Sequence, residues 1–143
     1  MEPKEMERLW SSHLEAEFAT KDVEAALATM TEDAYVNHVP HNSGGRGRDE
    51  VRAFYRDVFI PSWPDDVQVL QMNRVVGDEQ LVDESHVTFT HTTKMEWFLP
   101  GVPPTNRKVE VDVVVVVQFR HDRIACERIY WDQATVLRQV GLL

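Results

Sequence analysis

Apolar residues recur every three or four positions in the first part of the chain, a spacing that predicts helices with one buried face. The first such pattern covers residues 5–20. Asp22 then offers an N-cap for a shorter helix that ends near Thr31. A third pattern begins at residue 48 or 49 and stops at Pro61, which cannot continue a regular helix.

The second part of the chain carries alternating and β-branched residues, which are typical of strands. Helices followed by consecutive strands predict an α+β fold, with the helices packed on one face of an antiparallel sheet. A short extended piece at residues 35–40 and a glycine-rich loop at residues 41–47 separate the second and third helices. The predicted later elements are strands at 67–76, 80–92, 109–119 and 123–132, a proline-rich connection at 93–108, and a final helix at 133–140.

The last two strands form a predicted hairpin around a run of five valines, residues 113–117. If His121 and Asp122 make a two-residue turn, Arg120 lies opposite Arg123 and the register follows along both strands. A β-bulge would exchange the two faces beyond it. Without a bulge, one face carries Val111, Val113, Val115, Val117, Phe119, Ile124, Cys126, Arg128, Tyr130 and Asp132.

The length of the chain and its net charge limit the classes of protein to which it can belong. The 143 residues suit a single domain, residues 1–143, and a formal net charge of -9 argues against binding nucleic acid. The single cysteine, Cys126, excludes an internal disulfide and a zinc site built on several cysteines. No secretion signal and no membrane-spanning stretch is apparent, so we expect a cytoplasmic protein that does not bind membranes.

Several motifs resemble a known family. They are Thr90-His91-Thr92, the segment 100–107 (Pro-Gly-Val-Pro-Pro-Thr-Asn-Arg), the strand opening Arg123-Ile-Ala, and Asp132 placed seven residues before Gln139-Val-Gly. With these motifs the chain resembles the SnoaL-like polyketide cyclase family of the nuclear transport factor 2-like superfamily over nearly its whole length. The resemblance implies a cone in which a curved antiparallel sheet, wrapped by the N-terminal helices, encloses an apolar pocket. It also implies a homodimer, and chemistry without cofactor or metal.

The resemblance places Asp132 where the cyclases carry a general acid/base, and it matches His91 to a histidine at the end of an earlier strand. A carboxylate at the polar end of an apolar pocket would have a raised pKa, as a general base needs. The alternative is that Asp132 caps the helix that begins at Gln133. The family motif usually has glycine where this chain has Asn106, so we expect a positive φ there.

The predicted substrate pocket combines the polar end of the hairpin with aromatic side chains of the helices and strands. Arg128 would either bind an anionic group or pair with Asp132, which would lower the pKa of the aspartate. The histidines of residues 38–91 lack the spacing of a metal site, so no metal is predicted. The predicted pocket residues are Tyr130, Arg128, His38, Tyr35, Phe54, Phe89 and Trp131.

Two functions remain open at this point. The first is a cofactor-independent lyase or isomerase of the polyketide-cyclase type, which acts by general acid/base chemistry on a small apolar carbonyl compound. The alternative is a non-catalytic protein of the same fold that binds a small hydrophobic molecule. A cavity-facing Asp132 with a second ionisable group beside it would favour the enzyme.

Overall fold

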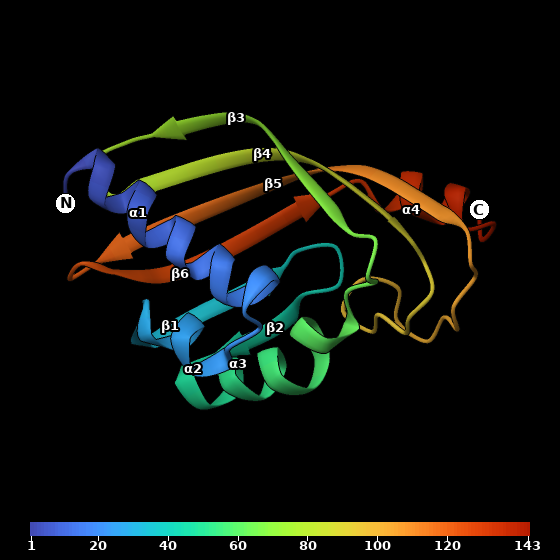
Figure 1. Cartoon of the computed structure of the whole chain (residues 1–143), viewed down its shortest axis with the longest axis horizontal. Helices are drawn as coiled ribbons and strands as arrows, with labels where there is room; N and C mark the ends of the chain where they lie inside the picture. Colours follow the sequence, from blue (N-terminus) through green and yellow to red (C-terminus); the bar gives the residue numbers. More distant parts are fainter.

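The computed structural model describes residues 1–143 as one six-stranded sheet with helices on its concave side and at its ends (Figure 1). The strand order is β2-β1-β6-β5-β4-β3. The helices are α1 (Pro3–Leu14), α2 (Val23–Ala28), α3 (Arg48–Phe54) and α4 (Gln133–Gln139). The strands are β1 (Met30–His38), β2 (Ser43–Arg46), β3 (Gln68–Val76), β4 (Gln80–Thr90), β5 (Lys108–Arg120) and β6 (Arg123–Trp131).

The α+β class is confirmed, with two differences in the sheet. All neighbouring strands pair antiparallel except β1 and β6, which run parallel because β1 enters from the helices rather than through a hairpin with β6. Half of the predicted glycine-rich loop is the edge strand β2, where Gly44 and Gly45 pair with Asn37 and Val36. Gly44 is required there, since a Cβ would lie 1.9 Å from the carbonyl oxygen of Val36.

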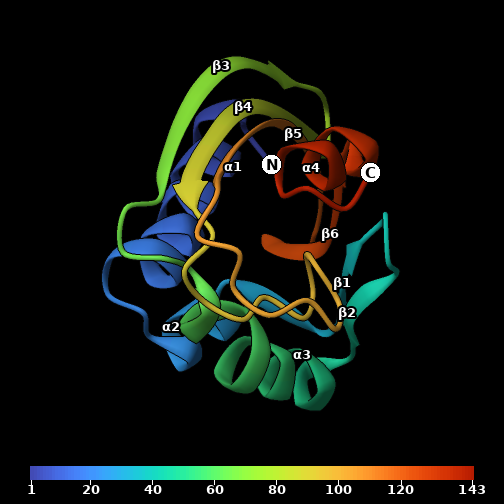
Figure 2. The ribbon, with the colours of Figure 1, turned by 90° about the vertical axis from the view of Figure 1, so that its right-hand side faces the viewer.

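The sheet curls around an interior that α1 closes from one side (Figures 1 and 2). Helix α1 runs along the concave face and contacts β4 and β6. Helices α2 and α3 lie on the side opposite β3 (Figure 2). Helix α4 lies against β5, where the side chain of Gln139 exchanges two hydrogen bonds with the backbone of Glu110. None of the helices combines the length and the apolar character that crossing a membrane would require.

The predicted hairpin of β5 and β6 is present, and a bulge changes its register. His121 and Asp122 form the turn with positive φ values of 53° and 59°. Arg120 pairs with Arg123 as expected, but Gln118 pairs with Cys126, which leaves Ala125 without a partner. Beyond Ala125, every residue of β6 therefore faces the side opposite to the one that an unbulged register predicts.

Two helices end in a π-helical turn that changes which side chains face inward. Residues Glu15–Ala19 continue α1, and residues Tyr55–Phe59 continue α3. A π-helical turn rotates the residues after it relative to an α-helix, and such turns occur frequently at functional sites. Here the first turn carries the buried Glu17, and the second carries the buried Tyr55 and Phe59.

Candidate functional site

A cavity of about 100 Å³ lies between α1 and the concave face of β4, β5 and β6. Its wall is mostly apolar and includes the inward valines of β5, Val111, Val113 and Val115. Eight aromatic side chains line it: Trp10, Phe18, Phe59, Trp63, Phe89, Trp97, Phe98 and Trp131. The polar lining consists of Glu17, His38, Asp83, Ser85 and Glu127.

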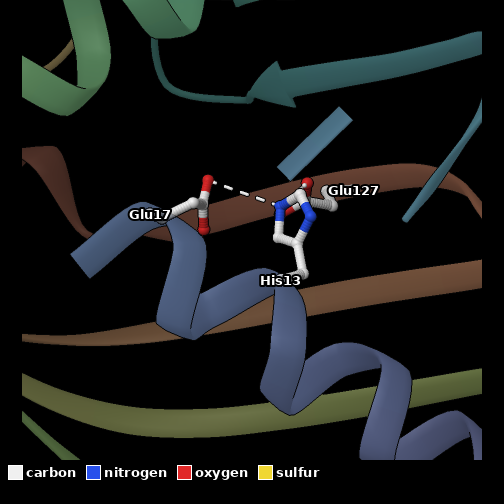
Figure 3. Close-up of side chains that lie close together, drawn as sticks. All are labelled: His13, Glu17 and Glu127. Carbon is white, nitrogen blue, oxygen red and sulfur yellow. Dashed lines mark ion pairs between the residues drawn. The ribbon is translucent and has the colours of Figure 1, made fainter. Parts of the chain in front are cut away.

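Two of the lining carboxylates belong to a buried cluster around His13 (Figure 3). His13 Nε2 lies 2.9 Å from Glu127 Oε2 and 3.5 Å from Glu17 Oε2. His13 and Glu17 come from one helix at i and i+4, whereas Glu127 comes from β6. All three are buried, with exposed fractions of 4% or less. The cluster therefore joins the first helix to the strand that the bulge has turned inward.

The hydrogen bonds around His13 require a proton on each ring nitrogen. Thr29 Oγ1 donates to the carbonyl oxygen of Ala26 at 2.6 Å, so it must accept from His13 Nδ1 at 2.8 Å. The Tyr55 hydroxyl donates to Glu127 Oε2 at 2.8 Å, so its oxygen is an acceptor toward His13 Nε2 at 3.1 Å. His13 is accordingly an imidazolium, a buried cation.

The three members of the cluster shift one another's pKa values. Burial opposes the charge of His13, but Glu127 and Glu17 outweigh it and raise the pKa of His13 well above its ordinary 6.5. Burial also acts to raise the pKa of Glu127, but His13 and the hydroxyl of Tyr55 bind its carboxylate closely and lower the pKa. For Glu17, burial is the strongest influence and raises the pKa; the nearby charge of Glu127 raises it further, and the long ion pair with His13 offsets these effects only in part.

Trp10 connects this cluster to a second buried carboxylate. Its indole stacks on His13, with ring centroids 5.4 Å apart and planes 12° apart, which favours the cationic ring. Trp10 Nε1 donates to Asp83 Oδ2 at 2.7 Å. Arg74 binds both oxygens of Asp83, at 2.6 and 2.9 Å. The charges of Asp83 and Arg74 thus compensate one another at the edge of the cavity.

His38 is the second buried histidine at the cavity, and its state is opposite to that of His13. Its Nδ1 donates to the carbonyl oxygen of Ser43 at 3.2 Å, and its ring contacts Phe54, Phe59 and Trp97. Burial lowers the pKa of His38 to about 4. His38 is therefore neutral at ordinary pH, and its Nε2 is an acceptor.

Comparisons with known proteins identify the family. The model of the SnoaL-like domain matches residues 11–127. The chain belongs to this family. A search of proteins with curated functions finds no significant match to this SnoaL-like chain.

Solved structures share the fold of this SnoaL-like protein at low sequence identity. TsrD from Streptomyces laurentii matches with a TM-score of 0.75 and 17% identity, over 100% of this chain and 99% of that one. A candidate SnoaL-like polyketide cyclase from Jannaschia sp. CCS1 matches with a TM-score of 0.73 and 19% identity, over 98% and 91%. IdmH, a candidate polyketide cyclase from Streptomyces antibioticus, matches with a TM-score of 0.71 and 20% identity, over 94% and 97%. These likenesses show the nuclear transport factor 2-like fold that the resemblance implies.

Asp132, the predicted catalytic residue, lies outside the cavity. It is exposed and caps α4, accepting hydrogen bonds from the backbone N–H groups of Ala134 and Thr135 and from the Thr135 hydroxyl. These hydrogen bonds lower the pKa of Asp132, so the raised pKa expected for a base is wrong. The physical reason is the bulge at Ala125, which turns Glu127 inward and Asp132 outward.

His91, the second predicted catalytic residue, is buried but does not line the cavity. Its Nδ1 accepts from the backbone N–H of Thr105 at 3.2 Å, and its backbone pairs with Asn106 and Arg107. Burial lowers the pKa of His91. Asn106 has the expected positive φ, 59°. His91 therefore anchors the proline-rich connection, which carries Trp97 and Phe98 to the cavity.

Three of the predicted pocket residues, His38, Phe89 and Trp131, line the cavity. Phe54 lies one layer behind, against His38. The other three, Tyr130, Arg128 and Tyr35, were placed in the pocket wrongly: the bulge puts Tyr130 and Arg128 on the outer face, and Arg128 donates to Tyr35 there at 2.9 Å. The sequence interpretation missed His13, Glu17 and Asp83, and it considered Glu127 only as a residue that a β-bulge would turn inward.

His13, Glu17 and Glu127 are also residue types that bind divalent metal ions, and one ligand atom of each lies within 4.8 Å of the others. The hydrogen-bond pattern, however, places a proton on His13 Nε2, the atom that would bind the metal. In this protonation state, His13 Nε2 has no free electron pair with which to bind a metal ion.

The opposite shifts of the two buried histidines can be measured directly. Since the pKa of His13 is raised above 6.5, the folded protein keeps His13 charged as the pH rises past that value. Since the pKa of His38 is lowered to about 4, it stays neutral as the pH falls below 6.5. Ring-nitrogen NMR should show both His13 nitrogens protonated at pH 7.5 and only Nδ1 of His38 protonated at pH 5. A neutral His13 at pH 7.5 would contradict the assigned cluster.

The role of Asp132 as a cap predicts a limited effect of its removal. Asp132→Ala should lower the Tm by roughly 2–4 °C, because two backbone N–H groups of α4 lose their acceptor. Ligand binding and any activity should remain at the wild-type level. Asp132→Asn, which can still cap, serves as the control. Loss of activity in both variants with an unchanged Tm would restore Asp132 as a catalytic residue.

Proposed function

We propose that the protein is a cofactor-independent lyase or isomerase that uses Glu17 as its general acid/base on a small, largely apolar carbonyl compound. One observation carries this proposal: the carboxyl group of Glu17 is 4% exposed, lines the aromatic cavity, and makes only one long ion pair, 3.5 Å to His13. A carboxyl group in such surroundings is poised to exchange a proton with an enclosed molecule. Glu17 thus takes the place that the sequence interpretation assigned to Asp132.

The neighbouring groups influence the pKa of Glu17 in the direction that general acid/base catalysis requires. Glu127 holds the positive charge of His13 through the shorter contact, 2.9 Å, and receives a further hydrogen bond from Tyr55. Glu17 is left as the weakly compensated carboxyl group, and burial raises its pKa toward the pH at which a base works. Two carboxyl groups with pKa values shifted in opposite directions are the arrangement expected of an acid/base site.

The cavity also offers a donor for the charge that develops on a carbonyl oxygen. When Glu17 removes a proton from the carbon next to a carbonyl group, the electron pair moves to the oxygen as an enolate. Trp63 lines the cavity, and its indole N–H is buried without a hydrogen-bond partner in the protein. We assign this unpaired N–H as the donor to the enolate oxygen. In a substrate whose carbon–carbon double bond is conjugated with the enolate, Glu17 returns the proton at the far end of the conjugated system and so completes an isomerisation.

A non-catalytic binding protein is the second candidate. It is favoured by the contacts of Glu127, whose Oε2 binds both His13 and Tyr55 and thereby links α1 to β6. In this case Glu17 would serve only to recognise the ligand. The homodimer implied by the resemblance stays a prediction, and so does the cytoplasmic location.

Proton exchange distinguishes the two functions without knowledge of the natural substrate. In D₂O, a panel of small cyclic and aromatic ketones should lose α-proton NMR signal in the presence of the protein, since a base that removes a proton returns a deuteron. Glu17→Gln should reduce the exchange rate at least about 100-fold. Glu15→Gln, an exposed change in the same helical turn, should exchange as the wild type does. Equal exchange rates in Glu17→Gln and the wild type would contradict the role of Glu17.

A further inference from the structure

The ionisable residues that line the cavity are mostly acidic. Three carboxylates, Glu17, Asp83 and Glu127, belong to its lining, whereas no lysine or arginine does. His38, the one lining residue that could carry a positive charge, is neutral because burial lowers its pKa to about 4. The lining itself thus holds acidic groups without a charged basic one, and the cations that compensate Asp83 and Glu127, which are Arg74 and His13, lie behind it.

Glu17 is the carboxylate without a cation of its own. Asp83 accepts hydrogen bonds from Nε and Nη2 of Arg74, and Glu127 has the short contact with His13. Glu17 shares His13 at the longer distance of 3.5 Å. One buried positive charge is thus shared by two buried carboxylates. This arrangement has an unfavourable free energy unless Glu17 binds a proton or another cation.

The aromatic rings form walls around the cavity rather than a single stack. Trp63 is nearly perpendicular to Phe59 and to Phe89, with interplanar angles of 84° and 88°, and Trp97 is perpendicular to Trp131 at 87°. With ring centroids 5.8–5.9 Å apart, the rings of each pair are in edge-to-face contact, and together the pairs surround the cavity with aromatic surface. The faces carry partial negative charge, and cages of this kind bind alkylated ammonium groups.

We propose that the cavity binds a small organic cation, a tertiary or quaternary alkylammonium group, with its positive charge beside Glu17 and its methyl groups against the aromatic walls. This inference rests on the cavity being the binding site of the proposed function, and it specifies the charge of the ligand. A volume of about 100 Å³ is sufficient for a trimethylammonium group. The apolar walls suit alkyl groups on the nitrogen better than a hydrated metal ion.

Binding of such a cation would change the state of Glu17. Burial raises the pKa of Glu17 and so favours its protonated form. A positive charge beside it favours the ionised form, so binding of the cation shifts Glu17 toward proton release. The cation would therefore also put Glu17 in the form that a general base needs.

The test compares choline with 3,3-dimethylbutan-1-ol, which has the same shape but a neutral carbon in place of the nitrogen. All four tryptophans of the chain line the cavity, so tryptophan fluorescence reports binding of either compound. Choline should bind at least about tenfold more tightly than the alcohol, with sodium chloride added to equalise ionic strength. Equal binding, tighter binding of the alcohol, or no binding of choline would overturn the proposal.

Two variants and a calorimetric measurement test whether Glu17 is the group that gives the preference for choline. Glu17→Gln should lose the preference for choline while still binding the alcohol, and Glu15→Gln should keep the preference. Calorimetry in buffers of different ionisation enthalpy should show proton release with choline and none with the alcohol. Circular dichroism confirms that each variant is folded. Retained preference for choline in folded Glu17→Gln would exclude Glu17 as the partner of the cation.

These outcomes are independent of turnover. Choline preference without any proton exchange on ketones would support the cation site and contradict the proposed enzyme. Ketone exchange that depends on Glu17, combined with equal binding of choline and the alcohol, would support the enzyme and contradict the cation site.

Discussion

The buried charge of His13 is the interaction on which the site depends. A cation with no exposed surface is stable only when opposite charges and hydrogen bonds surround it, and His13 obtains these from three separate parts of the chain. Thr29 follows α2, Glu127 belongs to β6, and Tyr55 follows α3. The cluster therefore holds α1 against the concave face of the sheet and encloses the cavity between them.

The same cluster gives two chemically identical residues different properties. Glu127 takes the short contact with His13 and the hydroxyl of Tyr55, so its ionised form is favoured. Glu17 is equally buried but weakly paired, so its protonated form is favoured. The acid/base proposal and the cation proposal both follow from this difference, because a proton and an alkylammonium group are alternative partners for one carboxylate.

Local patterns were sufficient to predict most elements of the fold, with the exception of the edge strand β2. The helical spacing of α1, the cap at Asp22, the turn at His121 and Asp122, and the positive φ of Asn106 all depend on short segments, and the structure confirms them.

The site, in contrast, depends on contacts between distant segments. The bulge at Ala125 has no signature in the residues around it, and it decides that Glu127 faces inward while Tyr130 faces outward. A signal for Glu17 was present, since Trp10, His13 and Glu17 share one helical face, but only the packing of α1 on β6 shows that this face lines a cavity.

The carboxyl ¹³C NMR titration of Glu17 and Glu127 tests the central claim most directly, with signals assigned by the loss of one in Glu17→Gln. The account predicts that the pKa of Glu127 lies below the ordinary value of 4.5 and that the pKa of Glu17 lies above it. Ionisation of Glu17 at or below 4.5, or before Glu127 as the pH rises, would contradict the account.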